Sequence, residues 1–352
     1  YELNFWQKNK PVYVMINSRD GGMRCSGNAI SGFQRLTDRT KVYIYAEVDR
    51  SPMQMGALEN GAINASKASV EGRNACIALR YADGTPQVRL RYGVSFISEE
   101  QAKKNLQREI QHFDVDVVAA KGRRIWNEAL ANIQVKGGSE DQKTVLYTSY
   151  YRTFERPICY SEDGKYWSAY DGAVHYDGGI PFYTDDWIWD TYRAAHPLRA
   201  LIQPQKEENI IESYLRMAEQ MGTLWMPTFP EVTGDSRRMN SNHGIAMVAD
   251  ALYKGLKVDA KRGYEYSRKA LEEKTLAPWS GNPAGWIDDF YKQHGYIPAL
   301  REGEKETDPN VSDFEKRQPV AVTLGTAYDE WCLSRIASYL NKNKEASYYE
   351  RR

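Results

Sequence analysis

Apolar and polar residues alternate in two segments of the first hundred residues, 41–48 and 88–97. A period of two is typical of a strand that buries one face and leaves the other in solvent. The Asp83-Gly84 pair and the run RDGG at 19–22 supply turns between such strands. The pattern predicts an antiparallel sheet or sandwich. The positions expected on the buried face are Val42, Ile44, Ala46, Val48, Val88, Leu90, Tyr92, Val94 and Phe96.

After residue 97 the apolar spacing changes to that of helices. Ser98 with Gln101, and Ser139 with Gln142, have the spacing of a capping box, which closes the first turn of a helix. The charged stretch 301–318 predicts an exposed loop. Helical hairpins joined by long loops favour an α/α barrel or solenoid, whose loops at one end line a cleft. The later helices are predicted at 189–202, 206–221, 242–254, 259–273 and 327–341.

The charge balance argues against some classes of partner. The chain has 352 residues, with 47 Lys or Arg and 47 Asp or Glu, and nucleic-acid phosphates attract a surplus of basic residues instead. No stretch approaches the roughly 20 apolar residues that cross a bilayer, so we expect no membrane partner. The 4 cysteines stand far apart and favour neither a zinc site nor a disulfide framework. The 25 tyrosines and 9 tryptophans suit carbohydrate surfaces, because their rings offer an apolar face and a polar tip.

The segment TDDWIWDTYR at 184–193 concentrates acids and aromatic rings before a predicted helix. One interpretation is structural: Trp187 and Trp189 are core residues, the acids cap the helix, and Asp190 pairs with Arg193 three positions later. The other is functional: an indole face stacks on a sugar ring while a neighbouring carboxylate binds its hydroxyls. The pattern of residues alone leaves both interpretations open.

A second junction, residues 224–256, places Glu231 and Asp235 on a loop before a helix that starts near His243. Pro227 and Pro230 keep this loop out of helical conformation. Two acids that face a cleft are what a glycosidase needs, because one carboxylic acid protonates the leaving oxygen and a second carboxylate acts as nucleophile or activates water. Structural alternatives remain, since acids are favoured at a helix N-terminus and a lone histidine there often only makes a hydrogen bond.

Two further junctions carry acids and aromatic residues. Residues 280–298 contain Trp286, Asp288, Asp289 and His294 among glycines. Residues 323–331 contain Asp329 and Glu330, which we expect to open the last predicted helix. Either pair of acids can be explained by helix capping, and either can belong to a site.

Several motifs, in order along the chain, resemble those of one enzyme family. The chain resembles glycoside hydrolase family 92, the calcium-dependent exo-α-mannosidases. The resemblance implies a partial antiparallel β-sandwich at 1–97, linker helices at 98–138 and part of an (α/α)6 barrel at 139–352. It also implies hydrolysis of terminal α-mannose from glycans with inversion, a calcium cofactor, and secretion or export to the periplasm. The motifs are VSFISEEQAKKNLQREI, IWNEALANIQVKGGSEDQKTVLYTSYYR, DGAVH, WDTYRAAHPLRALIQP, MNSNHGIAMVADALYKG, GYIPA and TLGTAYDEWCLSRIASYL, over roughly residues 85–340.

The resemblance also implies roles for individual residues. Trp189 and Asp190 match the family's WDT element, whose aspartate contacts the terminal mannose. We place Arg193 and His243 in the same substrate-binding set. This match favours the sugar-binding interpretation of the segment 184–193.

The position of the general acid departs from the family pattern. Relatives have a glutamate there, in a GNET element, whereas this chain has Asp235, in TGDS. An aspartate is one methylene shorter, and a misplacement of about 1 Å can cost a hundredfold in rate. Either the loop compensates for the shorter side chain, or Glu231 serves instead, or the leaving group differs. Asp235 is the predicted acid, with Glu231 in reserve.

The glycine-asparagine-acid-acid motif that supplies the family's general base and part of its calcium site is absent from the sequence. We expect it beyond Arg352, and a tryptophan loop of the sandwich before Tyr1, so that the chain is a fragment lacking both ends. It is then predicted to lack the base, to have no assignable metal ligand, and to work with other fragments of the same polypeptide. Two alternatives remain: a non-catalytic carbohydrate-binding relative, or an α/α-barrel glycosidase for another sugar.

Overall fold

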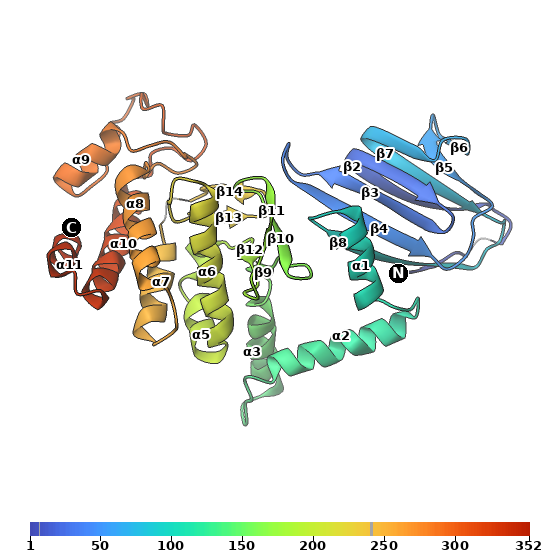
Figure 1. The fold of residues 1–352 in the computed structure, drawn as a ribbon, viewed down its shortest axis with the longest axis horizontal. Coiled ribbons are helices and arrows are strands. Elements are labelled where there is room, and N and C mark those ends of the chain that lie inside the picture. The colour runs from blue at the N-terminus through green and yellow to red at the C-terminus, as the bar shows by residue number, and fades with distance from the viewer. Residues whose placement is uncertain (7, 240–241) are drawn as a thin grey trace. The chain divides into compact units, whose positions relative to one another are not determined.

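The computed structural model describes residues 1–6, 8–239 and 242–352. The chain folds into two compact units (Figure 1). The first comprises Tyr1–Gly137 and the short segment Lys165–Trp167, and the second comprises Gly138–Gly164 and Ser168–Arg352. The predicted order, an antiparallel sheet followed by helices, is confirmed.

The first unit contains an 8-stranded sheet with the strand order β1-β8-β4-β3-β2-β7-β5-β6. Neighbouring strands run antiparallel, and the longest pairing joins β2 to β7 from Val12↔Tyr81 to Arg24↔Ser69. The strands predicted at 41–48 and 88–97 correspond to β4 and β8. The strand bounds are β1 Glu2–Asn4, β2 Val12–Ser26, β3 Ala29–Arg35, β4 Lys41–Val48, β5 Gln54–Glu59, β6 Ala62–Asn64, β7 Ser69–Tyr81 and β8 Gln87–Ser95.

The apolar core of the first unit is formed by residues of β2, β3, β4, β7 and β8, and helix α1 (Glu99–Glu109) packs on strands β3, β4 and β8. A side chain at Gly93 would place a Cβ 2.4 Å from the carbonyl oxygen of Ala102, so glycine permits this packing. Val94, predicted to be buried, is 47% exposed, because the helix covers the sheet on the side of Gly93. The core residues are Val12, Val14, Met23, Cys25, Ile30, Val48, Ala75, Ile77, Leu79, Tyr81 and Val88.

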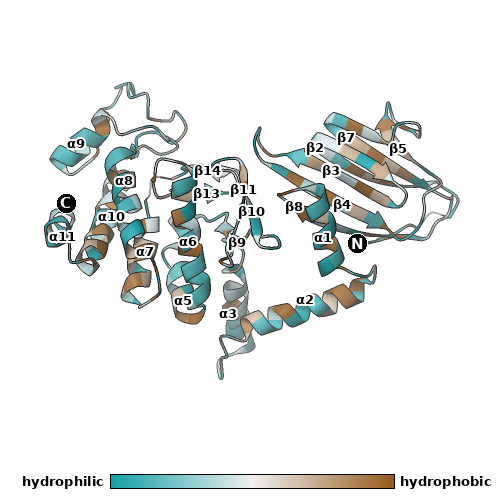
Figure 2. Cartoon of the chain, in the orientation of Figure 1, coloured by the Kyte–Doolittle hydropathy of each residue, from teal (hydrophilic) through white to brown (hydrophobic). Residues whose placement is uncertain are grey.

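The helices after the sheet begin with the predicted caps. The Ser98 hydroxyl accepts a hydrogen bond from the Gln101 backbone N–H at the start of α1, and Ser139 with Gln142 forms a capping box at the start of α3 (Glu140–Arg152). Between them, α2 (Val115–Leu130) has no buried residue, and Figure 2 shows apolar and hydrophilic segments along it.

The second unit consists of α3 and the following helices, with short strand pairs in the connections. The helix predicted at 189–202 is split into α4 and α5. Pro197 explains the break, because a proline inside a continuous helix lacks the N–H for the carbonyl of Arg193 and its ring clashes there. The bounds are α4 Ile188–Thr191, α5 Ala195–Ile202, α6 Pro204–Gln220, α7 Gly244–Tyr253, α8 Ala260–Glu273, α9 Trp286–His294, α10 Pro319–Tyr339, α11 Asn343–Glu350, β9 Ile158–Cys159, β10 Lys165–Ser168, β11 Ala173–Tyr176, β12 Tyr183–Thr184, β13 Pro230–Glu231 and β14 Gly234–Asp235.

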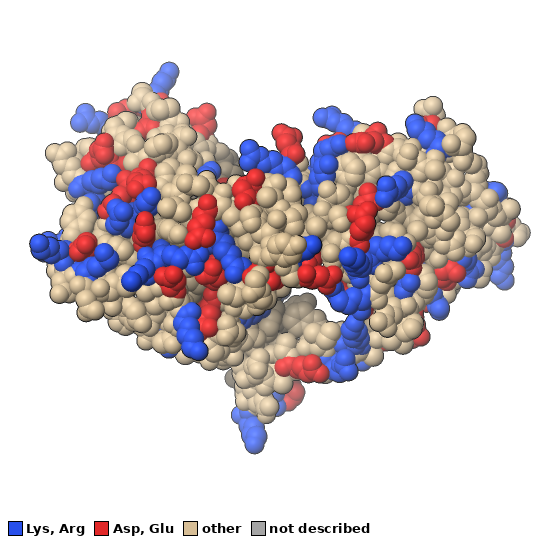
Figure 3. Space-filling view, in the orientation of Figure 1, with Lys and Arg blue, Asp and Glu red and all other residues tan. Residues whose placement is uncertain are grey.

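The core of the second unit lies among α6, α7, α8 and α10. Helix α10 starts at Pro319, earlier than predicted, and the charged stretch 301–318 is a loop as expected. None of the helices in the described ranges combines the length and the apolar character needed to cross a bilayer. Figure 3 shows acidic and basic side chains interspersed over the visible face, in keeping with the balanced composition.

Candidate active site

Three of the four junctions singled out in the sequence lie together in the second unit. The Asp186 N–H donates to the carbonyl of Pro230 over 2.9 Å, which joins the segment 184–193 to the β13–β14 hairpin. The rings of Trp187 and Phe229 lie 6.1 Å apart. Tyr192 lies over His243 with their ring centroids 4.0 Å apart, and His243 in turn contacts Asp329 of α10.

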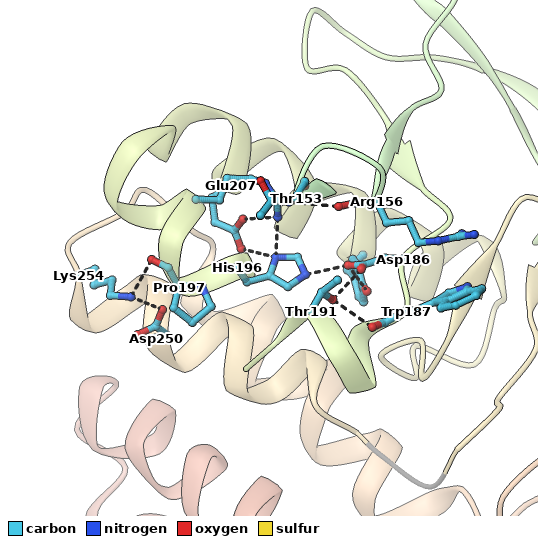
Figure 4. Close-up of polar contacts among 12 residues, drawn as sticks. Thr153, Arg156, Asp186, Trp187, Thr191, His196, Pro197, Glu207, Asp250 and Lys254 are labelled. Carbon is cyan, nitrogen blue, oxygen red and sulfur yellow. Dashed lines mark hydrogen bonds and ion pairs between the residues drawn. The ribbon is translucent and has the colours of Figure 1, made fainter. Parts of the chain in front are cut away.

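A buried charge network joins the segment 184–193 to helices α5 and α6 (Figure 4). His196 Nε2 lies 2.8 Å from Asp186 Oδ2, and His196 Nδ1 lies 2.8 Å from Glu207 Oε1. The Thr191 hydroxyl donates to the other oxygen of Asp186 over 2.7 Å. Arg199 donates to Glu207 over 3.3 Å, so two carboxylates face two cationic groups. The network thereby fixes the loop that carries Trp187 and Asp190 to helices α5 and α6.

The protonation state of this network follows from its surroundings. Burial alone lowers the pKa of His196, but the carboxylates of Glu207 and Asp186 outweigh it and raise that pKa to about 9. Burial acts to raise the pKa of Asp186, yet His196, Thr191 and Tyr214 together lower it. An imidazolium between two carboxylates is therefore the stable arrangement, because each ring nitrogen needs a proton to donate.

Of the predicted sugar-binding residues, Asp190 and Arg193 are exposed on this segment and Trp189 is partly exposed, whereas His243 is buried. Asp190 is exposed, and Trp187 is the more open of the two indoles, at 38% exposed. Arg193 does not pair with Asp190 among the contacts of the described residues; its guanidinium lies 4.9 Å from the Trp189 ring centroid. The structural interpretation of an Asp190–Arg193 ion pair is therefore wrong. An exposed carboxylate and a partly exposed indole lie in the same segment, and the Arg156 guanidinium lies over the Trp187 ring, 4.0 Å from its centroid.

Asp235 lies in the structure as an acceptor for the backbone of its own loop. Its Oδ1 accepts from the N–H groups of Phe229 (2.7 Å) and Arg237 (3.1 Å), and its Oδ2 accepts from that of Thr228 (3.0 Å). The side chain is 3% exposed. Both oxygens already accept hydrogen bonds from backbone donors, an arrangement that suits a buried carboxylate. This geometry argues against Asp235 as the proton donor and in favour of the reserve, Glu231.

Glu231 sits at the opposite end of the same hairpin, in a partly buried position. Its Oε1 lies 3.3 Å from Arg238 Nε, and its side chain is 16% exposed. Burial raises the pKa of Glu231, and the carboxylates of Asp185 and Asp235 raise it further, against the opposing effect of Arg238 and Arg156. A carboxyl group with a raised pKa that still reaches solvent has the properties of a general acid.

His243 is held by Asp329 rather than standing alone at a helix start. Its Nδ1 lies 2.7 Å from Asp329 Oδ1, while Asp329 Oδ2 accepts from the Asn242 N–H over 2.8 Å. The prediction that Asp329 opens a helix is wrong: α10 begins at Pro319, and Asp329 lies in its interior, fully buried.

Lys274 lies near the carboxylates of Asp235 and Asp329 and contacts a neighbour of each instead. Its ammonium group donates to the Thr228 hydroxyl and, over 3.1 Å, to Asn242 Oδ1. Burial, with Arg237, lowers the pKa of Lys274 to about 8, against the opposing pull of Asp235 and Asp329. The enclosed space beside it measures about 10 Å³, roughly the room one water needs. A space of this size does not admit a sugar ring.

The acids, the tryptophan and the histidine of the junction at 280–298 do not join the site, although its first residues pack against Arg237. Asp288 accepts from the N–H groups of Leu276 and Gly285, each over 2.7 Å, and so caps α9. Trp286, Asp289 and His294 are exposed on that helix. Glu330 faces away, toward Tyr291 and Arg352. The capping interpretation is correct for Asp288.

The sequence analysis missed the residues that support the site. Asp186 and His196 lie in or beside the quoted motif WDTYRAAHP, but nothing in their spacing showed that they would meet Glu207. Lys274 directly follows the helix predicted at 259–273 and was not singled out. In the described ranges, no group of three or more His, Cys, Asp and Glu residues could hold a metal ion.

Comparison with known proteins identifies relatives for most of the chain. Residues 101–352 match the model of the glycosyl hydrolase family 92 catalytic domain. An inverting family 92 mannosidase from Bacteroides thetaiotaomicron has a similar structure, with a TM-score of 0.83 and 27% identity over 96% of this chain and 45% of that one. A family 92 α-mannosidase from the same organism is 20% identical, with a TM-score of 0.81, over 98% of this chain and 46% of its own. The latter likeness concerns the fold alone.

A curated relative extends the comparison to a eukaryote. An uncharacterised secreted glycosidase from Arthroderma benhamiae is 24% identical over 274 residues, which are 76% of this chain and 30% of that protein. The chain thus spans less than half the length of the relatives it matches. The matched structures agree with the predicted fold class, an N-terminal β-domain followed by part of an α/α barrel.

Proposed function

Because the chain belongs to glycosyl hydrolase family 92, we propose that it forms part of an enzyme that hydrolyses terminal α-linked mannose from glycans with inversion. The inverting mannosidase that it resembles supports this reaction type. The secreted relative supports an extracellular or periplasmic location.

The observation that carries the proposal is the pair formed by Glu231 and the segment 184–193. A partly buried carboxyl group with a raised pKa stands on a hairpin joined by hydrogen bonding to the segment of Trp187 and Asp190. We assign Glu231 as the general acid that protonates the leaving oxygen. Trp187, Trp189, Asp190 and Arg193 are proposed to bind the terminal mannose, with His243 behind them.

An inverting reaction needs a second carboxylate that activates water on the opposite face of the sugar, about 6.5–9.5 Å from the acid. We propose that the remaining part of the polypeptide supplies this base. Calcium is proposed to bind there and to hold mannose hydroxyls, since oxygen ligands suit this hard cation. No step performed by the described residues depends on it.

The test uses the full-length polypeptide and two substrates. Glu231→Gln should reduce kcat/KM on α-mannobiose by about a hundredfold or more, within the usual contribution of general acid catalysis. It should have little effect on α-mannosyl fluoride, because fluoride leaves without a proton. The first product seen by NMR should be β-mannose. Equal losses on both substrates would remove Glu231 from the acid role.

The arrangement of Asp235 favours one alternative. Its three backbone hydrogen bonds occupy the carboxylate at the position where relatives have the acid, which also suits a non-catalytic carbohydrate-binding relative. Wild-type protein that binds α-mannobiose tightly and releases no mannose from either substrate would support this alternative.

A further inference from the structure

Resting on the function proposed above, we propose that Trp279 and Arg238 form the binding site for the leaving-group sugar, the unit from which mannose is cleaved. A general acid protonates the oxygen shared by two sugars, so the leaving sugar must lie beside the acid. The side chains that flank the hairpin of Glu231 and Asp235 are therefore the ones that can contact it.

A chain of contacts leads from Glu231 through Arg238 to Trp279. The Arg238 Nε lies 3.3 Å from Glu231 Oε1, and the guanidinium carbon lies 5.1 Å from the ring centroid of Trp279. Trp279 is 39% exposed, and Phe314 meets its ring edge-on with centroids 6.4 Å apart. A partly exposed indole, next to the arginine that pairs with the acid, gives the apolar face of a sugar ring a surface to stack on.

The loop of Trp279 is locked to the hairpin of the acid. The Trp279 N–H donates to the carbonyl of Arg237 over 2.9 Å. A Cβ at Gly281 would lie 2.3 Å from Arg237 Nη1, so the glycine lets the guanidinium pack against this loop. Trp279 and Arg237 have φ angles of 65° and 54°, which are strained for bulky residues. Strain of this kind concentrates at ligand-binding segments, because the surrounding structure must hold it in place.

The charges at this surface favour a neutral sugar. Arg238 pairs with Glu231, Arg237 Nε lies 3.8 Å from Asp235 Oδ2, and Arg156 pairs with Asp185. Each of these arginines near the acid is thus matched by a carboxylate, so none of them is left to attract an acidic ligand. We therefore infer a neutral hexose as the leaving group, stacked on Trp279 and hydrogen-bonded by Arg238.

The experiment compares variants of the full-length polypeptide on α-mannobioses of different linkage and on α-mannosyl fluoride, which has no leaving-group sugar. Trp279→Ala should lower kcat/KM about tenfold on the best mannobiose, the loss expected for one aromatic stacking contact. It should leave α-mannosyl fluoride hydrolysis unchanged, and Trp279→Phe should recover part of the loss. Trp286→Ala, which removes an exposed indole of α9, is the matched control and should change neither rate.

The outcomes separate this inference from the proposed function. The leaving-group site would be overturned if Trp279→Ala lowered kcat/KM equally on both substrates, or lowered it on no mannobiose. Activity of the wild type would still support the mannosidase. If the wild type hydrolyses neither substrate, the proposed function fails and this site fails with it. Trp279→Phe replaces the indole with a smaller aromatic ring that can still stack. Higher activity of Trp279→Phe than of Trp279→Ala would therefore distinguish lost stacking from a misfolded loop.

Discussion

The imidazole Nε2 of His196 lies 2.8 Å from Oδ2 of Asp186, and both side chains are buried. Because Asp186 also accepts a hydrogen bond from Thr191 and directly precedes Trp187, this contact helps to position the proposed sugar-binding surface. The position of that surface therefore depends on the buried ion pairs of His196 with Asp186 and Glu207.

Replacing His196 by Asn should destabilise the second unit by about 3–5 kcal/mol, because breaking a buried ion pair leaves its partners uncompensated. Chemical unfolding followed by fluorescence measures this. His175→Asn is the matched control, since His175 faces Asp171 over 2.8 Å near the surface. Its loss should stay below about 1 kcal/mol. Similar losses in both variants would contradict the charge-network account.

The same network predicts a pH dependence of stability. The pKa of His196 is raised from 6.5 to about 9 in the fold, so its contribution is complete below pH 6.5 and is lost as the pH rises through 9. The difference in unfolding free energy between wild type and His196→Asn should shrink across that window. A difference that stays constant from pH 6 to 10 would show that His196 is not protonated in the fold.

Asp235→Asn should weaken the hairpin rather than remove a proton donor. An amide NH2 would face backbone N–H groups that now donate to a carboxylate, so we expect a loss of about 1–3 kcal/mol in stability. Hydrolysis of α-mannobiose and α-mannosyl fluoride should fall by the same factor. Asp250→Asn, which breaks a surface pair with Lys254, is the control. A loss confined to α-mannobiose would restore Asp235 as the acid.

Lys274→Met removes a buried ammonium group and leaves an apolar side chain of similar length. Since the pKa of Lys274 is lowered from 10.5 to about 8, the fold disfavours its charged form, and wild-type stability gains as the pH rises from 8 to 10.5. Relative to Lys274→Met, wild type should gain up to about 3 kcal/mol over that range. Unfolding curves of both proteins at pH 7, 8.5 and 10 measure this, and parallel pH profiles would contradict it.

Calcium should leave the stability of residues 1–352 unchanged, because no cluster of acidic or histidine side chains in the described ranges could hold it. Thermal unfolding with millimolar calcium and with EDTA should give the same midpoint. In the full-length polypeptide, by contrast, EDTA should abolish release of mannose and added calcium should restore it. A calcium-dependent midpoint for this chain would show that its own residues bind the ion.

The sequence predicted strands and helix caps, which depend on residues that are close together in the chain. Residues 41–48 form a strand, and Ser139 with Gln142 caps a helix, because both depend on near neighbours. The contact between His196 and Glu207 could not be predicted, since it requires two helices to pack with a known geometry. The role of Asp235 was assigned by position in a motif, whereas the direction of its side chain depends on three backbone N–H groups of a folded loop.

Gly93→Ala tests the packing of the first unit, where α1 approaches β8. The new methyl group would lie 2.4 Å from the Ala102 carbonyl and 2.8 Å from the Leu106 nitrogen, both backbone atoms that move only with the helix. Overpacking of this kind typically costs about 1–3 kcal/mol. Gly122→Ala in α2 is the matched control, because nothing lies within 4 Å of its added methyl. That variant should instead gain up to about 1 kcal/mol, as alanine favours a helix over glycine. Because the two changes add the same atoms, opposite signs in chemical unfolding would isolate the helix–sheet contact, and equal signs would contradict it.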